Sequence, residues 1–301
     1  MQAHWGAVVE NEGKTRVLDR VGFGCGALST LGTPRASRRL LEGVLELGIR
    51  HFDTAPLYGR GYSERLLGQF LRGKRESVSI ATKFGLVPGY VPPLPVGLAM
   101  GLNALRRWGA RARRVPASVA SSPAPAPPPP SPPADRPSAP TIDRDAVKTA
   151  FDGSCRALGT DHIDLYLLHE HVPSALTSGA MDFLLDLKAS GRVGQIGLAA
   201  NGSRYAGLSH AELMPWDVLQ YEYGPAWPDH ASLPQRFPTK SHVFHSCLRG
   251  VTGGGQAPGR VLARCLRDNP SARVLFSSTR LDHVSENVRT LNALAPSDAD
   301  L

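Results

Sequence analysis

Short apolar runs alternate with amphipathic helical patterns along most of this chain. Leu40, Leu41, Val44 and Leu45 have the spacing of one helix face, and Gly48 follows them as a helix stop before the next apolar run. The same order recurs downstream and predicts eight strands. We expect the strands at residues 21–28, 49–55, 77–85, 161–171, 194–200, 217–223, 242–247 and 272–278.

Helical patterns separate most of these expected strands. They cover residues 63–73, 141–159, 181–189, 259–269 and 281–294, and Thr141 is the expected N-cap of the second of them. Strands joined in this way by helices favour an α/β fold built as a single (β/α)8 barrel, the TIM barrel, over a doubly wound sheet. We therefore expect one domain across residues 1–301.

One segment interrupts the alternation after the third expected strand. Residues 115–140 contain eleven of the 26 prolines, in runs that include PPPP. Proline lacks a backbone N–H donor and its ring fixes φ, so this segment is incompatible with a helix or the interior of a sheet. We predict a disordered, proline-rich insertion in the barrel.

Composition and charge limit the partners and the compartment. The net charge of +8 raises nucleic acid, an acidic membrane surface or an anionic small molecule as partners. The densest basic run, residues 106–114, has only Trp108 as an interleaved aromatic, which favours a solvated flank over a nucleic-acid groove. No run reaches the roughly 18 apolar residues of a membrane helix, and four scattered cysteines form no CxxC pair. We expect a cytoplasmic protein with neither nucleic-acid nor membrane partners.

Four reactive side chains stand at the carboxyl ends of expected strands. Asp53 and Tyr58 flank the turn after the second strand, Lys83 ends the third, and His169 ends the fourth. In a (β/α)8 barrel the carboxyl ends of the strands form the rim that carries the chemistry. The pattern therefore predicts one site that contains a carboxylate, a phenol, an amine and an imidazole.

The segments around these four residues resemble the aldo-keto reductase family. FDTAPLYGRGYSERLLG is similar to the family's signature around Asp53 and Tyr58, ATKFG to its Lys83 strand, and DHIDLYLLH to its His169 strand. The three motifs stand in the family's order, and the resemblance extends from about Val21 to the C-terminus, apart from the insertion. It implies an NAD(P)H-dependent oxidoreductase that interconverts an aldehyde or ketone and an alcohol.

The resemblance also implies where a nicotinamide cofactor binds. NADPH is favoured, with NADH as the alternative, and no GxGxxG or P-loop motif is present. Asn201 stands where the family holds the carboxamide, although the Ser-Asn dipeptide is replaced by Ala199, Ala200 and Asn201. The resemblance assigns the remaining cofactor contacts to Gln220, Tyr223, Ser277, Ser278, Arg280, Glu286 and Asn287.

Each of the four reactive residues has a definable role in carbonyl reduction. Tyr58 would donate a proton to the carbonyl oxygen, and a nearby Lys83 ammonium would favour the phenolate that remains. Asp53 would pair with Lys83, and His169 would donate a hydrogen bond to the same oxygen. The substrate is then a small carbonyl or alcohol compound, and no metal is needed.

Two other classes of function stay open from the sequence. A metal-dependent hydrolase on the same barrel is suggested by His169, Glu170 and His171 together with His242, His245 and Cys247. A catalytically weak or inactive cofactor-binding sensor or adaptor is suggested by the altered carboxamide segment and by the proline-rich insertion. The sequence indicates neither the substrate nor the oligomeric state.

Overall fold

Eight parallel strands close into a barrel in the computed structural model, which describes residues 16–86, 141–251 and 257–294. The strands pair in sequence order, and β1 pairs with β8 through the register Val21 to Val274, so that the sheet has no edge. The strands are β1 (Val21–Gly24), β2 (His51–Asp53), β3 (Ser79–Phe84), β4 (Ile163–His169), β5 (Val193–Ala199), β6 (Val218–Glu222), β7 (Ser241–His245) and β8 (Arg273–Phe276).

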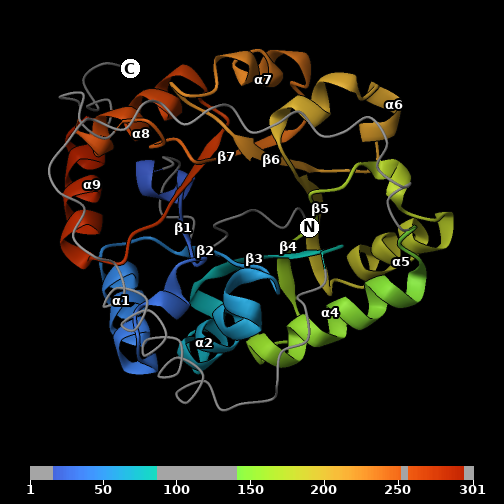
Figure 1. The fold of residues 1–301 in the computed structure, drawn as a ribbon, viewed down its shortest axis with the longest axis horizontal. Helices are drawn as coiled ribbons and strands as arrows, with labels where there is room; N and C mark the ends of the chain where they lie inside the picture. The colour runs from blue at the N-terminus through green and yellow to red at the C-terminus, as the bar shows by residue number, and fades with distance from the viewer. Residues whose placement is uncertain (1–15, 87–140, 252–256, 295–301) are drawn as a thin grey trace, which may run out of the picture.

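Helices surround the barrel as an outer ring (Figure 1). The prediction of a single (β/α)8 barrel is confirmed. No helix within the three described ranges is long and apolar enough to cross a membrane. The helices are α1 (Pro34–Glu46), α2 (Tyr62–Leu71), α4 (Arg144–Leu158), α5 (Ser178–Ala189), α6 (His210–Leu213), α7 (Leu233–Arg236), α8 (Pro258–Asp268) and α9 (Leu281–Ala293).

The expected N-cap at Thr141 is wrong by two residues. Asp143 is the N-cap of α4, because its Oδ1 accepts the Ala146 N–H at 2.8 Å. Thr141 and Ile142 precede the helix in non-helical backbone, and Ile142 forms a parallel bridge with Leu176. The expected proline-rich insertion at 115–140 lies outside the described residues, and the single domain over 1–301 stays a prediction.

The barrel interior is filled by alternate residues of the strands. A buried apolar cluster inside it comprises Ala81, Leu165, Leu167, Ala199, Val218, Val243 and Leu275. Successive side chains of a strand point to opposite faces, so the residue two positions beyond each of these also points inward. Lys83, His169 and Gln220 stand two positions beyond Ala81, Leu167 and Val218, so their side chains also point into the barrel. The apolar layer supports a polar layer at the carboxyl rim.

Helices α2 and α4 approach each other closely at Gly68. A Cβ atom added at Gly68 would lie 2.3 Å from the carbonyl oxygen of Ala157, which belongs to the backbone of α4. At Gly153, on α4 itself, an added Cβ would meet no atom within 4 Å. Both glycines lie inside helices, so they differ in surroundings rather than in backbone conformation.

We expect alanine substitutions at these two glycines to have opposite effects. Gly68→Ala should lower the free energy of unfolding by about 1–3 kcal/mol, because the helices must separate. Gly153→Ala, the matched control, should raise it by about 0.5–1 kcal/mol through helix propensity. Urea denaturation of the two variants and the wild type tests this; equal effects would show that the α2–α4 approach has no energetic weight.

Candidate active site

A buried ion pair joins β2 to β3 at the rim of the barrel. Lys83 Nζ donates to Asp53 Oδ1 at 2.7 Å and to the Thr54 carbonyl oxygen at 2.9 Å. The Lys83 and Asp53 side chains are only 3% and 6% exposed. The second carboxylate oxygen, Asp53 Oδ2, accepts the Gln220 Nε2 donor at 2.9 Å. The carboxylate is thereby held from both sides, and it fixes the ammonium in place.

Tyr58 lies against this ion pair. Its ring centroid is 4.9 Å from Lys83 Nζ, so the ammonium lies directly beside the aromatic ring. Burial raises the pKa of Tyr58 above its ordinary value, while the Lys83 charge opposes that rise. Burial alone would lower the pKa of Lys83, but Asp53 and Tyr58 raise it. At neutral pH the site therefore holds a protonated phenol beside a cationic amine.

His169 completes the group from the end of β4. Its ring meets the Tyr58 ring edge to face, with the centroids 6.0 Å apart. Burial first, and then the Lys83 charge, lower the pKa of His169 to about 3. A neutral imidazole has one N–H donor and one acceptor nitrogen, so near neutral pH His169 can donate a hydrogen bond without carrying charge.

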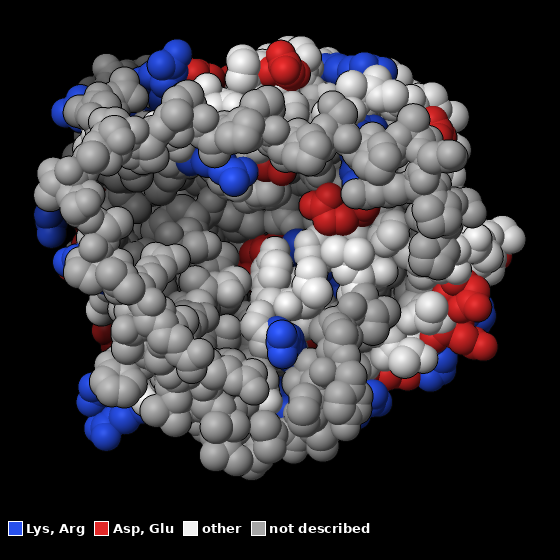
Figure 2. Space-filling model, in the orientation of Figure 1, with Lys and Arg blue, Asp and Glu red and all other residues white. Residues whose placement is uncertain are grey.

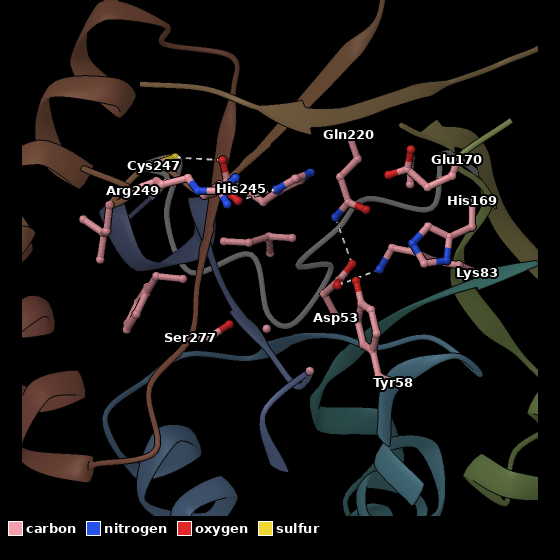
Figure 3. Close-up of a pocket in the computed structure, with 17 residues that line it drawn as sticks. Asp53, Tyr58, Lys83, His169, Glu170, Gln220, His245, Cys247, Arg249 and Ser277 are labelled. Carbon is pink, nitrogen blue, oxygen red and sulfur yellow. Dashed lines mark hydrogen bonds and ion pairs between the residues drawn. The ribbon is translucent and has the colours of Figure 1, made fainter. Parts of the chain in front are cut away.

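These residues line one cavity of about 360 Å³. Figure 3 shows Tyr58, Lys83 and His169 on one side of it and His245, Cys247 and Arg249 on the other. In Figure 2, acidic and basic side chains stand beside a hollow near the centre of this face. The full lining is Gly24, Gly26, Asp53, Tyr58, Lys83, His169, Glu170, Ala199, Gln220, His245, Ser246, Cys247, Leu248, Arg249, Leu275, Phe276 and Ser277.

The cavity includes six of the twelve residues that the sequence assigned to catalysis or to cofactor binding. They are Asp53, Tyr58, Lys83, His169, Gln220 and Ser277. The other six do not line it: Asn201, Tyr223, Ser278, Arg280, Glu286 and Asn287.

The six residues outside the cavity have other contacts. Asn201 caps the turn that follows it by accepting the Ser203 N–H, and the Tyr223 ring stacks on Phe244 with the centroids 3.9 Å apart. Arg280 pairs with Asp282. Ser278 Oγ hydrogen-bonds the backbone of Arg280, Glu286 is exposed on α9, and Asn287 is buried there. Their predicted cofactor contacts stay predictions.

The segment after β7 carries the residues that sequence reasoning did not assign to the cofactor. His245, Ser246 and Arg249 directly follow or end that strand, and all line the cavity. Their position at the carboxyl end of a barrel strand was the signal in the sequence that could have identified them.

Two residues at the rim have a strained backbone. Ser246 and Glu170, the residues after the two rim histidines, have φ of 56° and 57°, a left-handed conformation that is costly for residues other than glycine.

The hydrolase alternative requires a group of side chains that could bind a metal ion. Within the described part of the chain, no group of three or more His, Cys, Asp or Glu residues could hold a metal ion. The two histidine segments that suggested a hydrolase are both inside those ranges.

The chain belongs to the aldo/keto reductase family, whose model matches residues 20–237. It is 29% identical over 208 residues to pyridoxal 4-dehydrogenase of Microbacterium luteolum, a match that covers 60% of this chain and 52% of that protein. The chain thus spans about half the length of this curated relative.

Solved structures share the fold at lower identity. An aldo-keto reductase of Bacillus halodurans in its holo form superposes with a TM-score of 0.62 and 20% identity, over 93% of this chain and 89% of that one. An aldo-keto reductase of Klebsiella pneumoniae in complex with NADPH gives a TM-score of 0.57 and 18% identity, over 91% and 85%. Both support the barrel architecture.

The lowered pKa of His169 predicts a measurable pH dependence of stability. Unfolding restores the ordinary pKa near 6.5, so between about pH 6.5 and about pH 3 the unfolded chain binds one more proton than the folded chain at this residue. The contribution of His169 to the free energy of unfolding is therefore lost as pH falls through this window. In His169→Gln the slope should decrease by about 1.4 kcal/mol per pH unit.

A second histidine provides the control of opposite sign. Hydrogen bonding to Asp164 raises the pKa of His162, so its contribution is present below pH 6.5 and is lost as pH rises through the folded pKa. His162→Gln should leave the acid slope of His169 intact. Urea unfolding at a series of pH values measures both slopes, and an unchanged acid slope in His169→Gln would contradict the assignment.

Proposed function

We propose that this protein is an NAD(P)H-dependent oxidoreductase that reduces an aldehyde or ketone to an alcohol, or catalyses the reverse reaction, with Tyr58 as general acid. The observation that carries the proposal is the buried contact of Asp53, Lys83 and Tyr58 beside a neutral His169 in one cavity. Family membership supports the same reaction class.

Together these side chains deliver a proton to the carbonyl oxygen and stabilise the phenolate that is left. Tyr58 donates its hydroxyl proton to the carbonyl oxygen, and the Lys83 ammonium stabilises the phenolate that remains. Asp53 keeps that ammonium in position through its 2.7 Å bond. His169 donates a hydrogen bond to the same oxygen and so orients the substrate. In the oxidative direction the same proton returns to Tyr58.

One specific observation supports the binding of a nicotinamide cofactor in this cavity. Gln220 Oε1 is buried and accepts no hydrogen bond from the described residues, while its Nε2 is committed to Asp53. A carboxamide N–H₂ group offers the donor that this oxygen needs. Gly24 and Ser277 form the opposite wall, where a Cβ at position 24 would lie 2.4 Å from Ser277 Oγ. When bound, the cofactor supplies or accepts the hydride.

The remaining parts of the proposal follow from the family. NADPH is the expected cofactor, with NADH as the alternative, and Asn201, Tyr223, Ser278, Arg280, Glu286 and Asn287 are its expected further contacts. The substrate is a small carbonyl or alcohol compound, and we place the protein in the cytoplasm. Because one relative is named a dehydrogenase, both directions should be assayed.

Replacing the phenol of Tyr58 tests the acid directly. Tyr58→Phe should bind NADPH as the wild type does but lose turnover of an aldehyde panel by roughly 10²- to 10⁴-fold, since it cannot donate the proton. The matched control is Tyr62→Phe, a buried tyrosine four residues on that does not line the cavity. NADPH fluorescence titration and steady-state rates measure the two effects.

Each other outcome has a defined meaning. Turnover that persists in Tyr58→Phe would remove Tyr58 from the acid role. If the wild-type protein binds NADPH but turns over no carbonyl or alcohol, the result would favour a cofactor-binding sensor over an enzyme. A wild-type protein that binds neither NADPH nor NADH would overturn the proposal.

A further inference from the structure

One carboxylate in the cavity lining has no part in the proton chemistry described above. Glu170 directly follows His169 at the end of β4 and lines the cavity. Figure 3 shows its carboxylate turned toward the cavity, on the side of His169 and Gln220. Asp53, the other carboxylate among the described lining residues, is already held by Lys83 and Gln220. Glu170 is therefore the acidic side chain that is left to meet a ligand.

The backbone fixes Glu170 in this position at an energetic cost. Its φ of 57° is left-handed, which is unfavourable for a residue that has a Cβ atom. Two hydrogen bonds hold this conformation: the Glu170 N–H donates to the Ala199 carbonyl oxygen at 2.8 Å, and Arg204 Nη1 donates to the Glu170 carbonyl oxygen at 2.7 Å. Strain of this kind is concentrated in proteins at positions where the side chain has a function.

The Glu170 carboxylate lacks a committed cationic partner among the described residues. Burial raises the pKa of Glu170, and Glu222 adds to the rise, while Arg204 and the Asn201 N–H oppose it. The hydrogen bond that joins Arg204 to Glu170 goes to the backbone carbonyl oxygen, and the Arg204 side chain is exposed and outside the cavity lining. A cationic group of a ligand would therefore stabilise the ionised carboxylate.

We propose that Glu170 is a specificity-determining residue that selects carbonyl substrates with a positively charged group over neutral and anionic ones. The inference deepens the proposed function and rests on it. A carbonyl oxygen that is bound by Tyr58 and His169 brings its substrate beside the next residue of the chain, Glu170. The Lys83 charge is balanced there by Asp53, so the charge left over on this wall is negative.

The opposite wall of the cavity carries the contrary charge. Arg249 lines that wall, and its guanidinium carbon lies 5.6 Å from the centroid of the Trp227 ring. The Trp227 ring is stacked in turn on His230, with the centroids 5.6 Å apart. The cavity is thus negative beside His169 and positive beside Arg249 (Figure 3). A cationic substrate is attracted to the first wall and repelled by the second, so the charges also orient it.

Two aldehydes of the same shape separate the effect of charge from that of size. One is para-trimethylammoniobenzaldehyde, which has a fixed positive charge, and the other is neutral para-tert-butylbenzaldehyde. Their intrinsic reactivities differ, but this difference cancels when the ratio of their kcat/KM values is compared between variants. In Glu170→Gln the ratio of cationic to neutral aldehyde should fall roughly tenfold, because the ion pair is lost.

Two further variants serve as controls. Glu170→Asp keeps the charge and should keep most of the preference for the cationic aldehyde. Glu76→Gln removes an exposed carboxylate outside the cavity lining and should leave the ratio unchanged. With anionic para-carboxybenzaldehyde the ratio to the neutral aldehyde should rise in Glu170→Gln, since a repulsion is removed.

Binding of the corresponding alcohols distinguishes this inference from the proposed function. An alcohol and NADPH cannot react with each other because both are reduced, so calorimetry with NADPH present measures binding alone. A preference for the cationic alcohol that is lost in Glu170→Gln would support charge selection by Glu170, and absence of that preference would refute it. Aldehyde turnover with the same ratio in the wild type and Glu170→Gln would also refute it and leave the proposed function standing. Selective binding without turnover of any aldehyde or alcohol would overturn the proposed function alone.

Discussion

The salt bridge between Lys83 and Asp53 is the interaction on which the site depends. Removing two charges from water costs several kcal/mol per ion, and the cost is recovered only when every donor and acceptor finds a partner. Here the ammonium has hydrogen bonds to the carboxylate and to the Thr54 carbonyl and lies beside the Tyr58 ring, and the carboxylate has Gln220 as well. Three strands, β2, β3 and β6, therefore contribute to one network, and the closed barrel keeps them in register.

The same network explains why the neighbouring groups have their protonation states. The buried ammonium opposes the rise in the pKa of Tyr58 and adds to the fall in the pKa of His169. Burial is the larger cause of both shifts: it keeps the imidazole neutral with help from the cation, and it keeps the phenol protonated although the cation favours release of the proton. The apolar layer beneath, which includes Ala81, Leu167 and Val218, keeps the position of the cation dry.

The sequence predicted the barrel well, because strands buried on both faces leave nearly continuous apolar runs. It located Asp53, Lys83 and His169 because a strand end is visible in such a pattern. It could not show that the Tyr223 side chain packs on Phe244 rather than lines the cavity, since that depends on which face of β6 is inward. It also misplaced the N-cap at Thr141, because the Ile142–Leu176 bridge that keeps residue 142 extended is a tertiary contact.

Closure of the sheet has a consequence for how the chain is made. The strands β1 and β8 pair through Val21 and Val274, which are about 250 residues apart in sequence. During synthesis at roughly 5–20 residues per second, β1 emerges tens of seconds before its second neighbour exists. Until then one flank of β1 has unpaired backbone donors and acceptors, which can pair with other chains. The nascent chain therefore most needs protection from aggregation in the interval before β8 pairs with β1 and the barrel closes.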